Sequence, residues 1–252
     1  MVNHPPRISR RLLGGASGVP TVRSSDFSLS LVAFPAFASG YFDQAVPSYS
    51  GGSSGAAGGG AGGDESCPRF VKSSPSHQFG PGQSAGQLQF PAPILGPPRG
   101  AGSSQGSLDV VALGNGGQVT LAFGQTRIVD GPGPDFIVFE NAFFAGGDPE
   151  QVFAELATVE VSADGQSWTA FPCTASAAPY GACAGWHPVH ANAAENSLDP
   201  LDPAVAGGDA YDLAAIGVAE ARFVRITDRA DLEGMNGVFD LDAVGIVNAA
   251  CP

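Results

Sequence analysis

The alternation of apolar and polar residues in the second half of the chain predicts β-strands. Apolar side chains alternate in "QVTLAF" (118–123), and "ATVEVSADGQSWTAF" (157–171) predicts a strand, an Asp-Gly turn and a second strand. Two more strands are predicted by "ARFVRITD" (221–228) and "VFDLDAVGIV" (238–247), whereas "DLAAIGVAEA" (212–221) predicts one short helical turn. Short strands separated by Gly and Pro predict an all-β fold, an antiparallel β-sandwich.

A further strand ends in polar residues. In "FIVFEN" (136–141) four apolar residues run directly into Glu140 and Asn141, at a position where polar side chains can emerge at the rim of a sandwich. A buried Glu140 costs several kcal/mol unless a cation or an Arg pairs with it. Arg222 and Arg225 are the candidate partners, and a Glu140–Arg225 pair would make this stretch structural.

The first 66 residues differ in composition from the rest of the chain. "GGSSGAAGGGAGG" (51–63) has no apolar periodicity and cannot bury enough surface to order itself, so 39–66 is predicted to be a disordered, flexible linker. Strand-like sequence begins at Cys67. We therefore expect one folded domain over 67–252, long enough to form its own hydrophobic core.

The first 38 residues have the features of an export signal. Four arginines lie before the apolar stretch "FSLSLVAFPAFA" (27–38), which ends in small residues. The apolar stretch is too short to cross a bilayer as a helix, so no transmembrane segment is predicted. Residues 1–38 are expected to be a signal, or else an over-long start before the true one. A secreted, cell-surface or periplasmic location follows.

The charge of the chain excludes one class of partner. The sequence has 24 acidic and 11 basic residues, and four of the bases lie in the first 38 residues. Such an acidic domain repels a phosphate backbone, so nucleic-acid binding is not expected.

The four cysteines fall into a close pair and a distant pair. Cys173 and Cys183 can close a short loop, and Cys67 and Cys251 can tie the two ends of the domain together. Zinc binding is the alternative, but there is neither a C-x-x-C motif nor an interleaved histidine. We expect two disulfides, which agrees with export.

Two motifs resemble those of a known family. "VEVSADGQSW", followed some fifty residues later by "ARFVRI", resembles the strand pair of discoidin-like domains, also described as galactose-binding-like or F5/8 type C-like. Two further stretches, "IVDGPGPDFIVFENAF" and "FDLDAV", extend the resemblance. With them, the chain is similar to secreted bacterial cell-surface proteins and lipoproteins. The resemblance implies a jelly-roll β-sandwich over about 67–248.

Two acidic segments have the chemistry of calcium ligands. Gly, Pro and Asp residues in "DGPGPDFIVFEN" (130–141) and "NSLDPLDPAVAGGD" (196–209) form irregular loops that can turn several oxygens towards one ion. The candidate ligands are Asp130, Asp135, Glu140, Asn141, Asp199, Asp202 and Asp209. Neither segment follows the EF-hand spacing. The alternative is that the aspartates cap turns by accepting hydrogen bonds from nearby main-chain N–H groups.

Aromatic residues in the 173–211 segment are the candidate ligand-binding residues. Trp186 and Tyr180 can stack on a sugar, and His187 lies beside Trp186 in sequence. Trp168 follows the Asp-Gly turn and is expected to pack in the core. Together with the acidic segments, these residues predict a non-enzymatic module that binds a glycan or another surface component, with calcium as its cofactor.

Two other functions stay open. Paired carboxylates such as Asp240 and Asp242, two residues apart on a strand, could serve a polysaccharide hydrolase or lyase. A structural or adhesion protein of the matrix is the second alternative. The stretches "GGSSG" and "GSSQG" match a serine-hydrolase motif, but they lie in Gly/Ser-rich sequence without the strand-to-helix turn that exposes the nucleophile.

Overall fold

The computed structural model describes residues 67–232 and 237–252. The predicted export signal (1–38) and the predicted linker (39–66) lie outside these residues. The described part contains antiparallel β-sheets and four short 3-10 helices, and no α-helix. No helix in this part is long and apolar enough to cross a membrane.

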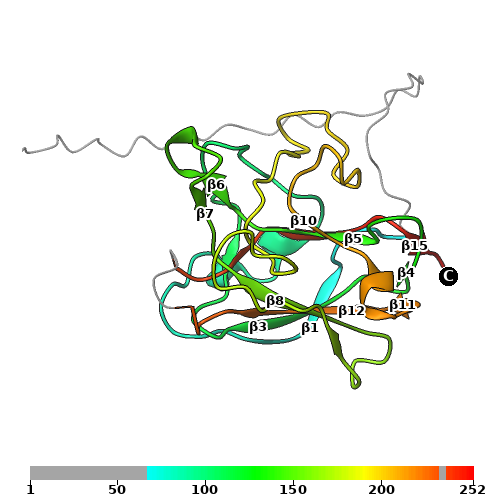
Figure 1. Cartoon of the computed structure of the whole chain (residues 1–252). Coiled ribbons are helices and arrows are strands. Elements are labelled where there is room, and N and C mark those ends of the chain that lie inside the picture. Colours follow the sequence, from blue (N-terminus) through cyan, green and yellow to red (C-terminus); the bar gives the residue numbers. More distant parts are fainter. Residues whose placement is uncertain (1–66, 233–236) are drawn as a thin grey trace, which may run out of the picture. The chain divides into compact units, whose positions relative to one another are not determined.

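Two layers of strands form a sandwich (Figure 1). The larger sheet of the described residues has the order β1-β3-β12-β8-β9. Its strands are β1 (Ser73–Gln78), β3 (Gln118–Ala122), β12 (Phe223–Asp228), β8 (Ala157–Ser162) and β9 (Thr169–Ala170). The second layer contains the sheet β10-β5-β14, with β10 (Asp209–Tyr211), β5 (Phe136–Phe139) and β14 (Ala243–Ile246).

Shorter sheets and 3-10 helices complete the sandwich. One small sheet has the order β11 (Glu220–Ala221), β4 (Arg127–Val129) and β15 (Ala249–Ala250). Two further sheets are pairs: β13 (Asp240–Leu241) with β2 (Val111–Ala112), and β6 (Phe143–Phe144) with β7 (Val152–Phe153). The 3-10 helices are η1 (Gln87–Gln89), η2 (Ala92–Ile94), η3 (Ala145–Gly147) and η4 (Leu213–Ile216). These elements and the sheets confirm the prediction of an all-β antiparallel sandwich.

The main core lies between the two layers. The alternating apolar residues of β3, β8 and β12 are buried there, as the period of two predicts. β5 differs because apolar residues occupy both of its faces. Phe136 and Val138 belong to the main core, whereas Ile137 and Phe139 pack in a second cluster. A strand covered on both sides needs an unbroken apolar run, which explains the sequence "FIVF".

The segment between β9 and β10 covers the outer face of β5. Val189, Ala191 and Ala206 from this segment pack on Ile137 and Phe139. The main-chain N–H of His190 donates to the carbonyl of Ala206, which holds two parts of the covering segment together. This segment carries the aromatic residues that the sequence suggests for ligand binding.

Two disulfides are present, between the pairs expected from the sequence. Cys67 is bonded to Cys251 with their Cα atoms 5.1 Å apart, and Cys173 is bonded to Cys183 with their Cα atoms 4.5 Å apart. The first links positions separated by 184 residues and joins the start of the sandwich to its end. The second closes a loop in the first part of the covering segment.

Two local predictions were wrong. The strand predicted over 238–247 is divided into β13 and β14, with Asp242 between them. Trp168 was expected in the core, but it is only half-buried because it precedes the short, exposed edge strand β9. Its ring lies under the guanidinium of Arg225, 4.1 Å from the ring centroid. The helical turn predicted within 212–221 is confirmed as η4.

Candidate functional site

A buried aspartate at the start of β10 organises the turn that carries Trp186 and His187. Asp209 is 4% exposed, and its Oδ1 lies 2.6 Å from Nδ1 of His187. Its Oδ2 accepts hydrogen bonds from the main-chain N–H groups of Gly185 (2.6 Å) and Trp186 (3.3 Å). Burial raises the pKa of Asp209, and the bond from His187 opposes this rise. One carboxylate therefore fixes three consecutive residues.

Trp186 and His187 form an aromatic surface at this turn. Their ring centroids are 3.8 Å apart, and Tyr180 packs edge-on against Trp186 at 5.9 Å. The His187 side chain is 48% exposed and Trp186 is half-buried, whereas Tyr180 is only 9% exposed. Trp186 and His187 can thus contact a ligand, while the buried Tyr180 packs against Trp186.

The turn requires a glycine at position 185. Gly185 has a φ of +93°, in the region that residues with a side chain rarely adopt. A Cβ at this position would also overlap the main-chain oxygen of Glu155. The turn that leads into Trp186 is therefore held closely against the main chain of Glu155.

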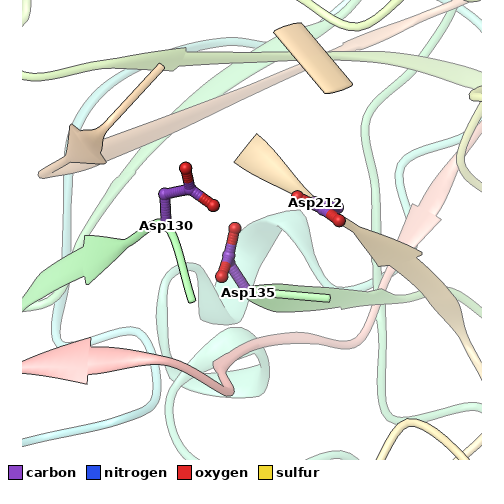
Figure 2. A group of neighbouring side chains, drawn as sticks. All are labelled: Asp130, Asp135 and Asp212. Carbon is purple, nitrogen blue, oxygen red and sulfur yellow. The ribbon is translucent and has the colours of Figure 1, made fainter. Parts of the chain in front are cut away.

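Two aspartates of the first acidic loop lie close to a third, Asp212 (Figure 2). One carboxylate oxygen from each of Asp130, Asp135 and Asp212 lies within 4.8 Å of the other two, so the three could hold one metal ion. Asp130 follows β4, Asp135 precedes β5, and Asp212 is the N-cap of η4. Asp212 was not among the predicted ligands, because it lies more than 70 positions along the chain from the other two.

The hydrogen bonds that two members of this triad accept also fit the turn-capping alternative. The fully buried Asp135 accepts bonds from the main-chain N–H groups of Gly131 (2.9 Å) and Leu213 (2.7 Å) and from Nδ2 of Asn248 (2.8 Å). Asp212 accepts a bond from the N–H of Ala214 at 2.8 Å. Asp135 and Asp212 therefore stabilise the ends of local elements, whether or not an ion is bound.

Glu140 and Asn141, predicted as ligands of the same loop, are not part of the triad. Glu140 follows β5 and is 1% exposed. The suggested pair between Glu140 and Arg225 is not formed. Nε of Arg225 instead donates to Oε2 of Glu160 at 2.7 Å, because these residues lie directly opposite each other on β12 and β8.

Glu140 has acidic neighbours. Burial raises its pKa well above the ordinary value, the charges of Glu155, Asp240 and Asp209 raise it further, and the main-chain N–H of Asn141 opposes the rise. Burial, followed by the charge of Asp240, raises the pKa of Glu155 to about 8. Burial also raises the pKa of Asp240 to about 6, although a hydrogen bond from Asn141 lowers it. The sequence did not single out Glu155, because "FAELAT" reads as the beginning of an ordinary strand.

The second acidic loop does not gather its aspartates around a common centre. Asp199 and Asp202 are exposed and accept bonds from the main-chain N–H groups of Leu201 and Ala204, each at 2.9 Å. Asp209 is bonded to His187 instead. Among the residues that the structure describes, none of these three aspartates joins a group of acids at metal-ligand spacing.

Asp240 and Asp242 do not form a facing pair. Oδ2 of Asp240 accepts a bond from Nδ2 of Asn141 (3.3 Å), whereas Oδ2 of Asp242 accepts one from the main-chain N–H of Arg99 (2.8 Å). Burial raises the pKa of Asp242 to about 7. The chain is irregular between β13 and β14, so the simple alternation of strand side chains does not apply across it.

No protein-family model and no curated protein matches the chain. Among solved structures, it is similar to one described as "Glycoside hydrolase", with 14% identity and a TM-score of 0.27 over 56% of this chain and 22% of the other. It is also similar to "CpGH89CBM32-6 produced by Clostridium perfringens", with 14% identity and a TM-score of 0.23 over 54% of this chain and 72% of the other. The chain thus spans less than a quarter of the first of these structures.

Proposed function

We propose that the protein is a non-enzymatic binding module of the cell exterior that recognises a glycan through Trp186 and His187. The observation that carries this proposal is the half-buried Trp186 ring, which packs against an exposed imidazole fixed by the buried Asp209. An indole face offers apolar area for the C–H face of a sugar, and the ordered imidazole offers a polar atom for a hydroxyl group.

The disulfides and the charge support this location and this class of ligand. Both disulfides fit an oxidising compartment, such as the outside of the cell or a periplasm. A net charge of −13 makes an anionic polymer an unfavourable partner, whereas a neutral glycan carries no such penalty. A protein partner in a matrix would use the same exposed surface, so the adhesion alternative differs from ours in the ligand and not in the site.

One observation favours a glycan-cleaving enzyme as the second candidate. Glu155, whose pKa is about 8, would be protonated at neutral pH, which is the state that a general acid requires. Glu155 and its neighbour Glu140 are, however, only 4% and 1% exposed. A sugar ring cannot reach carboxyl groups that are buried to this extent, so we favour binding over cleavage.

We further propose that calcium stabilises the module at Asp130, Asp135 and Asp212. Their three carboxylates supply hard oxygen ligands, and the exposure of Asp130 leaves space for water or main-chain oxygens in the shell of six to eight that calcium prefers. The Asp130→Asn variant removes one charge from the triad without breaking the bonds that Asp135 and Asp212 make. We expect it to bind one calcium ion fewer than the wild type.

A glycan array followed by titration with the bound glycan tests the proposed function. We expect Trp186→Ala to weaken binding at least tenfold, equivalent to about 1.4 kcal/mol. Trp168→Ala is the matched control, because it also removes an indole but acts at the Arg225 contact. Equal binding by the wild type and Trp186→Ala would contradict the proposal. Release of oligosaccharides from a polysaccharide by the wild type would favour the second candidate, a glycan-cleaving enzyme.

A further inference from the structure

An arginine lies directly against the disulfide between Cys173 and Cys183. Nη1 of Arg229 is 3.1 Å from Sγ of Cys173 and 3.8 Å from Sγ of Cys183. The same nitrogen donates to the main-chain carbonyl of Cys173 at 2.9 Å. The Arg229 side chain is only 12% exposed. A guanidinium group is thus held beside both sulfur atoms and is largely shielded from water.

Asp231 fixes the orientation of this guanidinium. Nε and Nη2 of Arg229 donate to Oδ1 and Oδ2 of Asp231 at 2.7 Å and 2.8 Å. This two-bond contact uses one edge of the guanidinium and leaves Nη1 to face the sulfur atoms. The Asp231 side chain is 67% exposed. Because water screens the exposed carboxylate more than the shielded guanidinium, the sulfur atoms lie in a positive field.

The other disulfide, between Cys67 and Cys251, has different surroundings. Arg69 is the basic residue closest to Cys67 along the described chain, and its Nη1 donates to the carbonyl of Val247 at 2.8 Å. Within residues 67–232 and 237–252, no arginine donates to either sulfur atom of this bond. The chain therefore provides its own reference for the effect of Arg229.

A cation beside a disulfide favours the exchange of that bond with another thiol. In this reaction a thiolate attacks one sulfur atom and expels the other as a thiolate. A neighbouring arginine lowers the pKa of a thiol and so stabilises the expelled thiolate. Cys173 is half-buried and can be approached, whereas Cys183 is 1% exposed. A thiolate expelled at Cys183 would be costly in this buried position without the cation that Arg229 supplies.

We propose that the Cys173–Cys183 disulfide is a site of thiol exchange, at which a small external thiol modifies Cys173. The external thiolate forms a bond with Sγ of Cys173, the bond to Cys183 breaks, and Cys183 leaves as a thiolate beside Arg229. A second external thiolate then attacks the bound thiol and releases Cys173 as a thiolate. The two external thiols are oxidised to a disulfide, the two cysteines are reduced, and the protons are exchanged with water. The net charge of −13 favours an uncharged thiol over an anionic one.

Opening this disulfide acts on the surroundings of Trp186. Tyr180 lies in the loop that the bond closes, and its carbonyl accepts a bond from the N–H of Cys183 at 3.2 Å. Cys183 and Tyr180 pack in one buried cluster, and the Tyr180 ring contacts Trp186. The open loop constrains Tyr180 less, so the environment of the Trp186 ring changes. This change gives an optical signal that requires no ligand.

Treatment of the folded full chain with the uncharged thiol mercaptoethanol, without denaturant, tests this site. Samples are quenched with acid over time, and peptide mapping measures the opening of each disulfide. We expect mercaptoethanol to be attached to Cys173 and not to Cys183. In a Trp168→Phe background Trp186 is the only tryptophan, and its fluorescence should change at the rate at which Cys173–Cys183 opens.

Two variants of the ion pair separate an effect of charge from an effect of structure. Arg229→Gln removes the cation and should slow the opening of Cys173–Cys183 at least about threefold, as expected when the pKa of the expelled thiol rises by about one unit. Asp231→Asn leaves the cation unpaired and should accelerate the opening. Both variants lose the same ion pair, so a merely structural role would change both rates in the same direction. Arg225→Gln is the matched control, because Arg225 is paired with Glu160, and its rate should equal that of the wild type.

Three results would overturn the proposal. One is a Cys173–Cys183 bond that opens only in denaturant. Another is a pair of variants whose rates change in the same direction or not at all. The third is a Trp186 fluorescence that stays constant while the bond opens. If Arg229→Gln does not fold, the exposed Asp231→Asn decides, because a rate no higher than that of Arg225→Gln contradicts the role of the cation. None of these results depends on whether the protein binds a glycan.

Discussion

The two disulfides should stabilise the fold to different extents. We compare the double variant Cys67→Ser/Cys251→Ser with Cys173→Ser/Cys183→Ser, so that neither protein contains an unpaired cysteine. The first change opens a link between residues separated by 184 positions, and the second opens a link between residues separated by 10. A cross-link lowers the entropy of the unfolded chain, and the effect grows with the logarithm of the loop length.

The loop lengths set the expected free energies. The long loop corresponds to about 5 kcal/mol of stability and the short loop to about 3 kcal/mol at 25 °C. In a domain of this size, 1 kcal/mol changes the melting temperature by about 2 to 4 °C. We therefore expect a decrease of about 10 to 20 °C for the first variant and about 6 to 12 °C for the second.

Scanning calorimetry and urea unfolding measure these decreases, and non-reducing peptide mapping verifies the remaining bond in each variant. The order of the two decreases is the decisive result. If opening the short loop costs as much as opening the long one, the disulfides act through contacts in the folded state, such as the packing of the buried Cys183, and not through the entropy of the unfolded chain.

Two further substitutions test local features. Gly185→Ala should lower the melting temperature well below that of Gly181→Ala. Both positions have positive φ, but only at Gly185 would a Cβ overlap the main chain, at the oxygen of Glu155. Equal melting temperatures would contradict this reason. Asp164→Ala should destabilise the turn after β8. The N–H groups of this turn lower the pKa of Asp164, so the stabilisation by its ionised carboxylate is present above the ordinary pKa of 3.8. It is lost as the pH falls through the lowered pKa. Melts of this variant and the wild type from pH 7 to pH 2 should therefore converge, and a constant difference would refute the role of the ionised carboxylate.

The fold could be predicted from the sequence because its strands obey simple periodicity. Alternation in β3, β8 and β12 reflects one buried face, and the unbroken apolar run of β5 reflects two. The break between β13 and β14 could not be predicted, because neither Gly nor Pro stands at or beside position 242 in "VFDLDAVGIV". Only the neighbouring strands show where the pairing changes, from β2 with β13 to β5 with β14.

The candidate sites were predicted less completely, because their members are distant in sequence. The chemistry of Asp130 and Asp135 was visible in one loop, but Asp212 joins them only through the pairing of β10 with β5. Glu140 was singled out because it ends an apolar strand. Its acidic neighbour Glu155 lies on another segment, and no local pattern links the two.

The buried Asp209 links the aromatic surface to Glu140. Asp209 holds the Trp186–His187 turn, and its charge also acts on Glu140. An ionised Glu140 would in turn make ionised Asp209 less favourable and weaken its bond to the imidazole of His187. The aromatic surface should therefore be most ordered when Glu140 is protonated, the state that its burial favours.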